Sequence, residues 1–320
     1  MKAVGVFHYG GPDVLEVVDV PVPQVGRGQI RIRVHAAAVN PADVLLRRGF
    51  TDPMLAGRLT PPYRPGMDAA GVVDEVGPDT ATDLQVGDRV MAMVVPIDPS
   101  GGAYAEYVTL DARQVVKAPA QSSHAEAATL PMNGLTARRA LDVLGLAPGD
   151  WIAVTGAAGA LGGYTVQLAK VDGLRVVADA SAADEELVRS LGADHVVRRG
   201  PDVAQRILQV VPGGVAAVVD AAVMGPKALP AIRPGGQIAL ARSEGEPGTT
   251  PLGATDNVMV RNVFVPDYRY AHDKLDTLRV LAEEGRLSLR VADEYPAERA
   301  AAAHRRFEAG GVRGRLIITF

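Results

Sequence analysis

Residues 151–170, WIAVTGAAGALGGYTVQLAK, change character halfway along the stretch. The stretch begins as a short apolar run, passes through alanines and glycines, and ends with the apolar periodicity of a helix. Gly156, Gly159 and Gly162 separate the two halves. The stretch therefore predicts a strand, a tight turn and a helix over about 162–171.

Glycines at such a turn let backbone N–H groups approach a diphosphate, and the helix N-terminus adds a partial positive charge. The spacing Gly-x-x-Gly-x-x-Gly is a variant of the usual dinucleotide fingerprint, although glycine-rich turns also serve packing alone. Here a strand pattern precedes the turn and a helix pattern follows it, which favours dinucleotide binding. The residues expected to contact the cofactor are Thr155, Gly156, Ala158, Gly159, Ala160, Leu161 and Gly162.

The patterns on either side of the turn predict two domains. From about residue 122, strand and helix patterns alternate, which is typical of a parallel sheet covered by helices on both faces. Before that point, short strands such as 29–39 (QIRIRVHAAAV) predict an antiparallel barrel or sandwich. The last stretch, GRLIITF, predicts a strand that rejoins the first domain. We expect one domain at 1–121 with 266–320, and a dinucleotide-binding domain at 122–265.

Charge and composition limit the partners of the chain. The 33 basic and 37 acidic residues give a net charge of -4 and are scattered along the sequence, which argues against nucleic acid. The most basic stretch, HRRFEAGGVRGR at 304–315, is interpreted as a solvated helix face. The chain has no cysteine, so disulfides, iron–sulfur clusters, cysteine nucleophiles and thiolate zinc sites are excluded.

The apolar runs are short and interrupted. The longest, GVAAVVDAAVMG, is too short to cross a bilayer. The N-terminal MKAVGVFHYGGPDVLEVVDV lacks the pattern of a signal peptide. We therefore expect a cytoplasmic protein with a small-molecule substrate and no membrane partner.

The strand after the glycine turn should end near the adenosine ribose. Asp179 lies where an acid binds the ribose 2′-hydroxyl in NAD users. Ser181 is placed to donate to a 2′-phosphate, and Arg198 and Arg199 follow the next strand, where a solvated loop is the alternative interpretation. These residues alone leave NAD and NADP both open.

Together the motifs give a family resemblance that runs nearly end to end. The chain resembles the zinc-free quinone oxidoreductases, the zeta-crystallin-like branch of the medium-chain dehydrogenase/reductase superfamily. The matching stretches are GGPDVLEVVDVPVP (10–23), AAVNPADVLLRRG (37–49), PGMDAAGVVDEVG (65–77), VGDRV (86–90), GGAYAEYV (101–108), LPMNGLTARRAL (130–141), TGAAGALG (155–162) and LGADHVV (191–197).

The resemblance implies a fold and an activity. The fold would be a GroES-like catalytic domain with an inserted Rossmann domain, a doubly wound parallel sheet. A cleft would hold NADPH, Rossmann edge strands would pair in a homodimer, and hydride would pass to a quinone or another α,β-unsaturated carbonyl. An enoyl reductase acting on CoA-linked or carrier-linked chains, and a non-catalytic NADPH-binding protein, remain the alternatives.

The resemblance also separates the chain from zinc-dependent alcohol dehydrogenases. Those relatives carry a cysteine in the segment matching Asn40–Asp43 and a His-Glu pair at the positions of Met67 and Asp68. The chain has none of these thiol ligands, and methionine is a poor zinc ligand. We therefore expect no metal site.

The resemblance assigns candidate residues to the nicotinamide end of the site. Asn40 would bind the substrate carbonyl or position the nicotinamide, and Asp43 would order a water or the ribose, with a helix cap as the alternative. Asn133 and Thr136 map beside the nicotinamide; Thr136 has a helix cap as its alternative role. A tyrosine of some relatives is Leu45 here, which favours protonation from solvent.

Further residues bear on cofactor choice and on the pocket wall. The lysine and tyrosine that bind the 2′-phosphate in relatives fall at Asp184 and Arg199. Losing the lysine weakens the case for NADPH, and Arg199 partly restores it because a guanidinium binds phosphate well. On balance NADP(H) is favoured over NAD(H). Tyr63 and Tyr104 are expected either to reach the pocket or to pack in the core.

Overall fold

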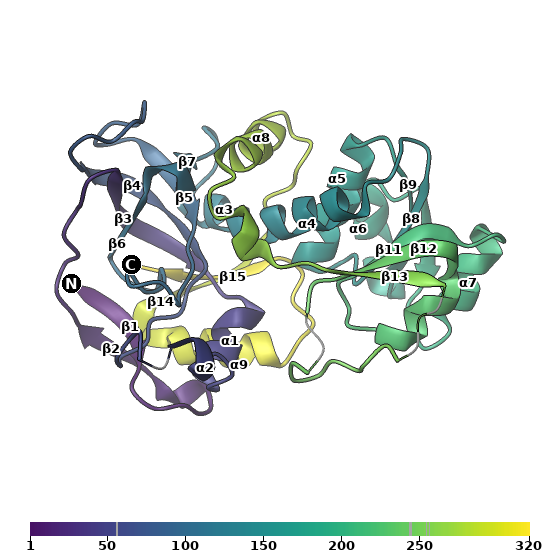
Figure 1. The fold of residues 1–320 in the computed structure, drawn as a ribbon, viewed down its shortest axis with the longest axis horizontal. Coiled ribbons are helices and arrows are strands. Elements are labelled where there is room, and N and C mark those ends of the chain that lie inside the picture. Colours follow the sequence, from purple (N-terminus) through teal and green to yellow (C-terminus); the bar gives the residue numbers. More distant parts are fainter. Residues whose placement is uncertain (56, 243–244, 254, 256) are drawn as a thin grey trace. The chain divides into compact units, whose positions relative to one another are not determined.

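Figure 1 shows a computed structural model of the chain, which describes residues 1–55, 57–242, 245–253, 255 and 257–320. The described chain divides into two compact units. The first unit comprises Met1–Met132, Pro266–Glu284 and Leu289–Phe320, and the second comprises Asn133–Val265 and Gly285–Ser288. The boundary by contacts therefore falls at Met132, whereas the sequence pattern places it between residues 121 and 122.

The first unit is built on a sheet of seven strands in the order β14-β15-β3-β4-β5-β7, with β6 also paired to β3. A separate hairpin joins β1 and β2. The strands are β1 Lys2–Val6, β2 Leu15–Asp19, β3 Gln29–Ala38, β4 Asp68–Val76, β5 Arg89–Met93, β6 Tyr107–Asp111, β7 Val115–Lys117, β14 Val291–Pro296 and β15 Arg315–Thr319. The helices are α1 Pro41–Arg47, α2 Asp52–Leu55, α3 His124–Ala128, α8 His272–Glu283 and α9 Ala300–Glu308.

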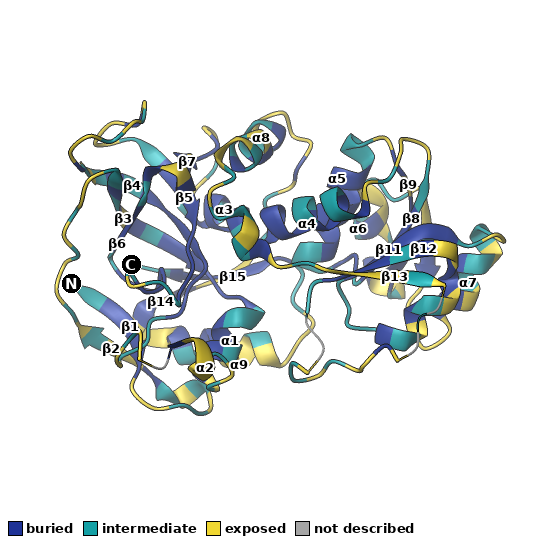
Figure 2. Ribbon diagram, viewed as in Figure 1, coloured by how far each residue is buried: buried dark blue, intermediate teal, exposed yellow. Residues whose placement is uncertain are grey.

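Strand β3 is central to this sheet because its sequence alternates. Ile30, Ile32 and Val34 are fully buried or nearly so, and the residues between them are more exposed. Figure 2 shows the same concentration of buried residues along β3 and β4. The last strand, β15, pairs antiparallel with β3, which confirms that the end of the chain rejoins the first domain.

The second unit is a parallel sheet of six strands in the order β10-β9-β8-β11-β12-β13. Its strands are β8 Trp151–Thr155, β9 Arg175–Ala180, β10 His195–Arg198, β11 Val215–Asp220, β12 Ile232–Leu240 and β13 Val258–Asn262. Its helices are α4 Pro131–Leu144, which begins at the boundary, α5 Ala160–Val171, α6 Glu185–Ser190 and α7 Val203–Val210. The predicted alternation of strands and helices is confirmed, and α5 begins two residues earlier than expected because Ala160 and Leu161 are already helical.

The strand order creates a switch point in this sheet. The chain moves outward from β8 through β9 to β10, and then returns to place β11 on the other side of β8. Because crossovers between parallel strands are right-handed, α5 and α6 cover one face and α7 covers the other. Alternate strand positions such as Ala153, Val177 and Val218 form a buried cluster with Ile207 of α7. Ligands of such sheets bind at the switch point, beyond the carboxyl ends of the strands.

Two local predictions differ from the structure. The strand patterns of the first domain extend to GGAYAEYVTL at 101–110, but strand β6 begins only at Tyr107, because glycines and turns occupy the start of this stretch. The basic stretch at 304–315 is not wholly a solvated face, since His304 and Arg315 are 0% and 3% exposed. Among the described residues, no helix is long and apolar enough to cross a membrane.

Candidate active site

The glycine turn lies at the carboxyl end of β8, on one side of the switch point. Gly156 has a φ of 67°, a conformation that favours glycine, and Gly159 precedes the first residue of α5. The N–H groups of a helix's first turn have no carbonyl partner within the helix. The N–H groups of Ala160, Leu161 and Gly162 therefore offer donors, at a positive helix end, to an anionic group.

Gly162 lets the helix pack closely on the turn. A Cβ atom at this position would lie 2.3 Å from the Gly156 carbonyl oxygen and 2.7 Å from its carbonyl carbon. No side chain fits there without moving backbone atoms. This close approach is the one that a diphosphate-binding turn requires of its last glycine, so the residues present fit a dinucleotide.

Asp179, at the end of β9, supports the turn. Its Oδ1 accepts hydrogen bonds from Gly156 N at 2.6 Å and from Ala157 N at 3.3 Å. Burial raises the pKa of this carboxyl group, and the two N–H groups and Arg199 oppose the shift. The carboxylate expected at the ribose thus also fixes the conformation of the turn.

The residues expected at the 2′ position lie together at the ends of β9 and β10. The Ser181 hydroxyl donates to Asp184 Oδ2 at 2.5 Å, so its proton has a partner other than the expected phosphate. Asp184 is 7% exposed, whereas Arg198 and Arg199 are both exposed. Arg199 therefore presents an exposed positive charge that acts on Asp179.

Asn133 and Thr136 lie one turn apart on α4 in the second unit, and both are largely buried, at 8% and 4% exposure. Leu135 and Ala137, beside Thr136 on the same helix, are also buried. Their assignment to the nicotinamide end stays a prediction.

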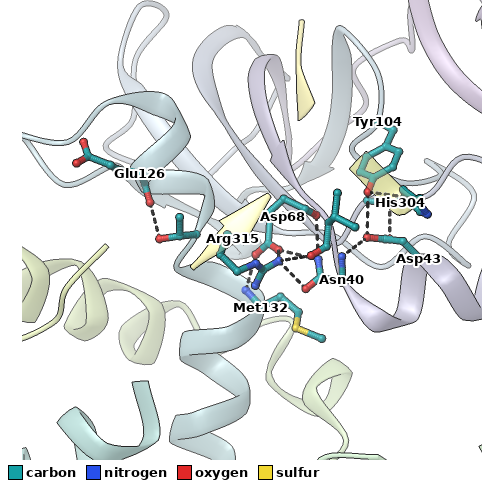
Figure 3. Close-up of polar contacts among 12 residues, drawn as sticks. Asn40, Asp43, Asp68, Tyr104, Glu126, Met132, His304 and Arg315 are labelled. Atoms are coloured by element: carbon teal, nitrogen blue, oxygen red, sulfur yellow. Dashed lines mark hydrogen bonds and ion pairs between the residues drawn. The ribbon is translucent and has the colours of Figure 1, made fainter. Parts of the chain in front are cut away.

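A polar cluster of the first unit surrounds Asn40, at the end of β3 (Figure 3). Its Nδ2 donates to Ala38 O at 3.1 Å and to Asp68 Oδ2 at 2.8 Å. Its Oδ1 accepts from Arg315 Nη2 at 2.7 Å. Both ends of this buried amide are therefore engaged by the protein itself.

Asp68 and Arg315 form a buried ion pair at the centre of this cluster. Arg315 Nη2 lies 3.0 Å from Asp68 Oδ2, and Met132 N donates to Asp68 Oδ1 at 2.6 Å. Burial raises the pKa of Asp68, while the Arg315 guanidinium opposes the shift. The guanidinium thus supplies the positive charge that this carboxylate needs.

Asp43 continues the cluster toward α9 (Figure 3). Its carboxylate accepts from Asn40 N at 2.8 Å, from Gly66 N at 2.7 Å and from the Tyr104 hydroxyl at 3.3 Å. Tyr104 Oη in turn lies 3.2 Å from His304 Nε2. Burial raises the pKa of Asp43 to about 7, although the N–H groups of Gly66 and Asn40 lower it.

These contacts bear on the structural alternatives that the sequence left open. Asp43 caps the start of α1 through Asn40 N, and Tyr104 packs in the core with no exposed surface. Tyr63 stacks on Tyr9, with ring centroids 5.8 Å apart. Sequence patterns missed Arg315 and His304, whose partners lie more than 190 residues away. A charged residue within a strand pattern, as in GRLIITF, was the available signal for Arg315.

His304 predicts a pH-dependent loss of stability. Burial first, and Arg47 second, lower its pKa to about 3, so folding keeps this ring neutral while the unfolded chain protonates below about pH 6.5. Above pH 6.5 the ring is neutral in both states, so it does not affect the free energy of unfolding. Below pH 6.5 the free energy of unfolding falls by about 1.4 kcal/mol for each pH unit, until about pH 3. The stability difference between wild type and His304→Gln should shift by that amount per unit in urea unfolding. The exposed His8→Gln is the control, and a difference independent of pH would contradict the assignment.

Known protein families and solved structures match the fold described above. The alcohol dehydrogenase GroES-like domain family matches residues 26–120, and the zinc-binding dehydrogenase family matches residues 191–318. A mycobacterial protein solved with NADPH superposes with a TM-score of 0.84 and 28% identity, covering all of both chains. A GroES-like domain with a Rossmann-type parallel sheet is the fold of the medium-chain dehydrogenases/reductases, and the chain has that fold.

Relatives found by sequence identify the family within this superfamily. Human quinone oxidoreductase is 30% identical over 334 residues, which cover 99% of this chain and 97% of the human protein. An Arabidopsis thaliana NADPH-dependent alkenal/one oxidoreductase is 36% identical over 248 residues, 74% of this chain and 61% of that protein. The match covers only 60–61% of the length of such chloroplastic plant relatives. The chain belongs to the quinone oxidoreductase family of the medium-chain dehydrogenase/reductase superfamily.

Proposed function

We propose that the protein is an NADPH-dependent reductase that transfers hydride to a quinone or another α,β-unsaturated carbonyl without a metal. The glycine turn with its close Gly156–Gly162 approach is the observation that carries this proposal. The names of the human and Arabidopsis relatives support the quinone and enone classes of acceptor. When bound, the reduced nicotinamide supplies the hydride.

The residues of the chain would bind the cofactor and orient it toward the acceptor. The backbone of residues 155–162 would hold the diphosphate against the N-terminus of α5, and Asp179 would keep the turn in shape while its other oxygen faces the ribose. Asn133 and Thr136 would contact the nicotinamide. Asn40 and Asp43 act as positioning residues, because their polar groups hold β3, α1 and β15 together. With leucine at position 45, the proton added to the reduced product comes from solvent.

The ligands that the chain offers support independence of zinc. The chain contains no cysteine, and position 67 is methionine. The carboxylate of Asp68 accepts hydrogen bonds from Arg315, Asn40 and Met132, so a guanidinium already neutralises it. The reaction therefore depends on alignment and on exclusion of water.

Oxidation of NADPH followed at 340 nm tests this function. The chelator-treated protein should consume NADPH with 1,4-benzoquinone and with a simple enone such as 3-buten-2-one, and added zinc should not increase the rate. Binding of NADPH without turnover over a broad panel of acceptors would instead identify a non-catalytic binding protein.

The preference for NADP(H) is proposed to rest on Arg199, which is exposed beside Asp179. A charge-assisted contact with the 2′-phosphate contributes about 1.5 kcal/mol, or about tenfold in affinity. Arg199→Ala should reduce the ratio of NADPH to NADH affinity by that factor in calorimetric titrations. The neighbouring Arg198→Ala removes the same charge and should leave the ratio unchanged. If Arg199→Ala leaves the ratio of NADPH to NADH affinity unchanged, Arg199 does not bind the 2′-phosphate.

A homodimer through the edge of the parallel sheet is also proposed. Strand β13 ends the strand order, and its other edge pairs with no described strand. Met259 and Val260 on it are 46% and 37% exposed, an apolar edge that a second copy would cover. Sedimentation velocity should give a dimer, and Val260→Lys should shift the protein toward the monomer. A wild-type monomer at micromolar concentration would contradict this arrangement.

A further inference from the structure

The second side of the switch point carries an unexplained feature, the loop 221–225 after β11. Val223 in this loop has a φ of 57°, in the left-handed region that β-branched residues avoid. The described residues with positive φ are otherwise glycines, apart from Asp79, whose residue type tolerates this region. A glycine would relieve the strain, yet the chain has valine.

Hydrogen bonds donated by the loop to the Asp220 carboxylate hold the loop in this conformation. Oδ1 of Asp220 accepts from Met224 N at 3.0 Å, and Oδ2 accepts from Gly225 N at 2.8 Å. The Thr155 hydroxyl donates to the same Oδ1 at 2.6 Å and accepts from Ala222 N at 3.2 Å. Asp220 and Thr155 are 3% and 1% exposed, so these bonds are shielded from water.

The same loop lies against the glycine turn. A Cβ atom on Gly156 would be 3.1 Å from Ala221 O and 3.2 Å from Ala222 N. Val223 also lines a hollow at the carboxyl ends of β11 and β12, together with Asp220, Leu240 and Arg242. The loop is therefore the second wall of the switch-point crevice, and the Thr155 hydroxyl joins it to the first wall through its hydrogen bonds with Asp220 and Ala222.

We propose that Val223 is a positioning residue for the nicotinamide cofactor: the strained backbone of Val223 holds its side chain in the wall of the hollow, and this side chain packs against the bound cofactor. Strained residues persist where the surrounding structure determines them, and they concentrate at binding sites. The inference rests on the proposed function, because it takes the ligand of the glycine turn to be NADPH or NADH. It adds a residue on the opposite wall that the fingerprint does not contain.

Titration calorimetry with NADPH and with NADH, together with thermal unfolding, tests this inference on the full chain. Val223→Gly relieves the strain, so its melting temperature should be no lower than that of wild type, while both dissociation constants rise at least fivefold. Asp79→Gly makes the matched change on an exposed turn and should leave both constants within twofold of wild type.

Two outcomes overturn the inference. Dissociation constants for Val223→Gly within threefold of wild type would show that the strained loop does not serve the cofactor. A lower melting temperature would show that Val223 stabilises the fold rather than strains it. Wild-type protein that binds neither nucleotide would overturn the proposed function as well. The wild-type titration therefore distinguishes a failure of the proposed function from a failure of the Val223 inference alone.

Discussion

Replacing Gly162 with alanine should reduce the affinity for NADPH by about 100-fold. The added Cβ would lie 2.3 Å from the Gly156 carbonyl oxygen, so the turn and the start of α5 must separate. Separation misaligns at least two N–H groups that would face the diphosphate, and charge-assisted bonds contribute about 1.5 kcal/mol or more each. Calorimetric titration of the variant with NADPH measures the loss.

Gly213→Ala is the matched control for this substitution. Gly213 belongs to the same unit, but a Cβ atom there meets no atom within 4 Å. Its NADPH affinity should equal that of wild type. Retained affinity in Gly162→Ala, with a normal melting temperature, would show that the glycine turn serves packing rather than the diphosphate.

The second large effect is expected at Asp68. Asp68→Asn keeps the shape of the side chain but leaves the Arg315 guanidinium, 3% exposed, without its counter-charge. Removing one partner of a buried ion pair destabilises a protein by about 3–5 kcal/mol. Urea unfolding of the variant should show a loss in this range.

An exposed pair provides the comparison. Asp79 pairs with Arg27 at 2.9 Å, but the two side chains are 67% and 79% exposed. Asp79→Asn removes the same charge and should change the free energy of unfolding by less than about 1 kcal/mol. Equal effects of the two substitutions would mean that the Asp68–Arg315 pair is not a stabilising centre of the first unit.

The sequence predicted the second unit well because its signals are local. A strand, a glycine turn and a helix follow one another within residues 151–170, and the alternation beyond them specifies a parallel sheet. The start of α5 was placed too late because alanine and glycine at 158–163 obscure the helical periodicity. The helix-cap role of Asp43 was one of the two alternatives that the sequence left open, and its carboxylate accepts a hydrogen bond from Asn40 N at the start of α1.

The polar cluster of the first unit could not be predicted in the same way. Its bonds join residues far apart, such as Asn40 with Arg315 and Tyr104 with His304. Periodicity and motif spacing carry no information about such pairs, so His304 and Arg315 looked like a solvated basic stretch. Their burial follows from the return of the chain through α9 and β15 to the edge of β3.

The most direct test of the central claim is transfer of a deuterium label. Protein treated with a chelator is mixed with NADPH that carries deuterium at both C4 positions of the nicotinamide and with 3-buten-2-one, and the butanone formed is analysed by mass spectrometry and NMR. We predict one deuterium at the former β-carbon and a solvent hydrogen at the α-carbon. Product without deuterium, or reduction that appears only after zinc is added, would contradict the account.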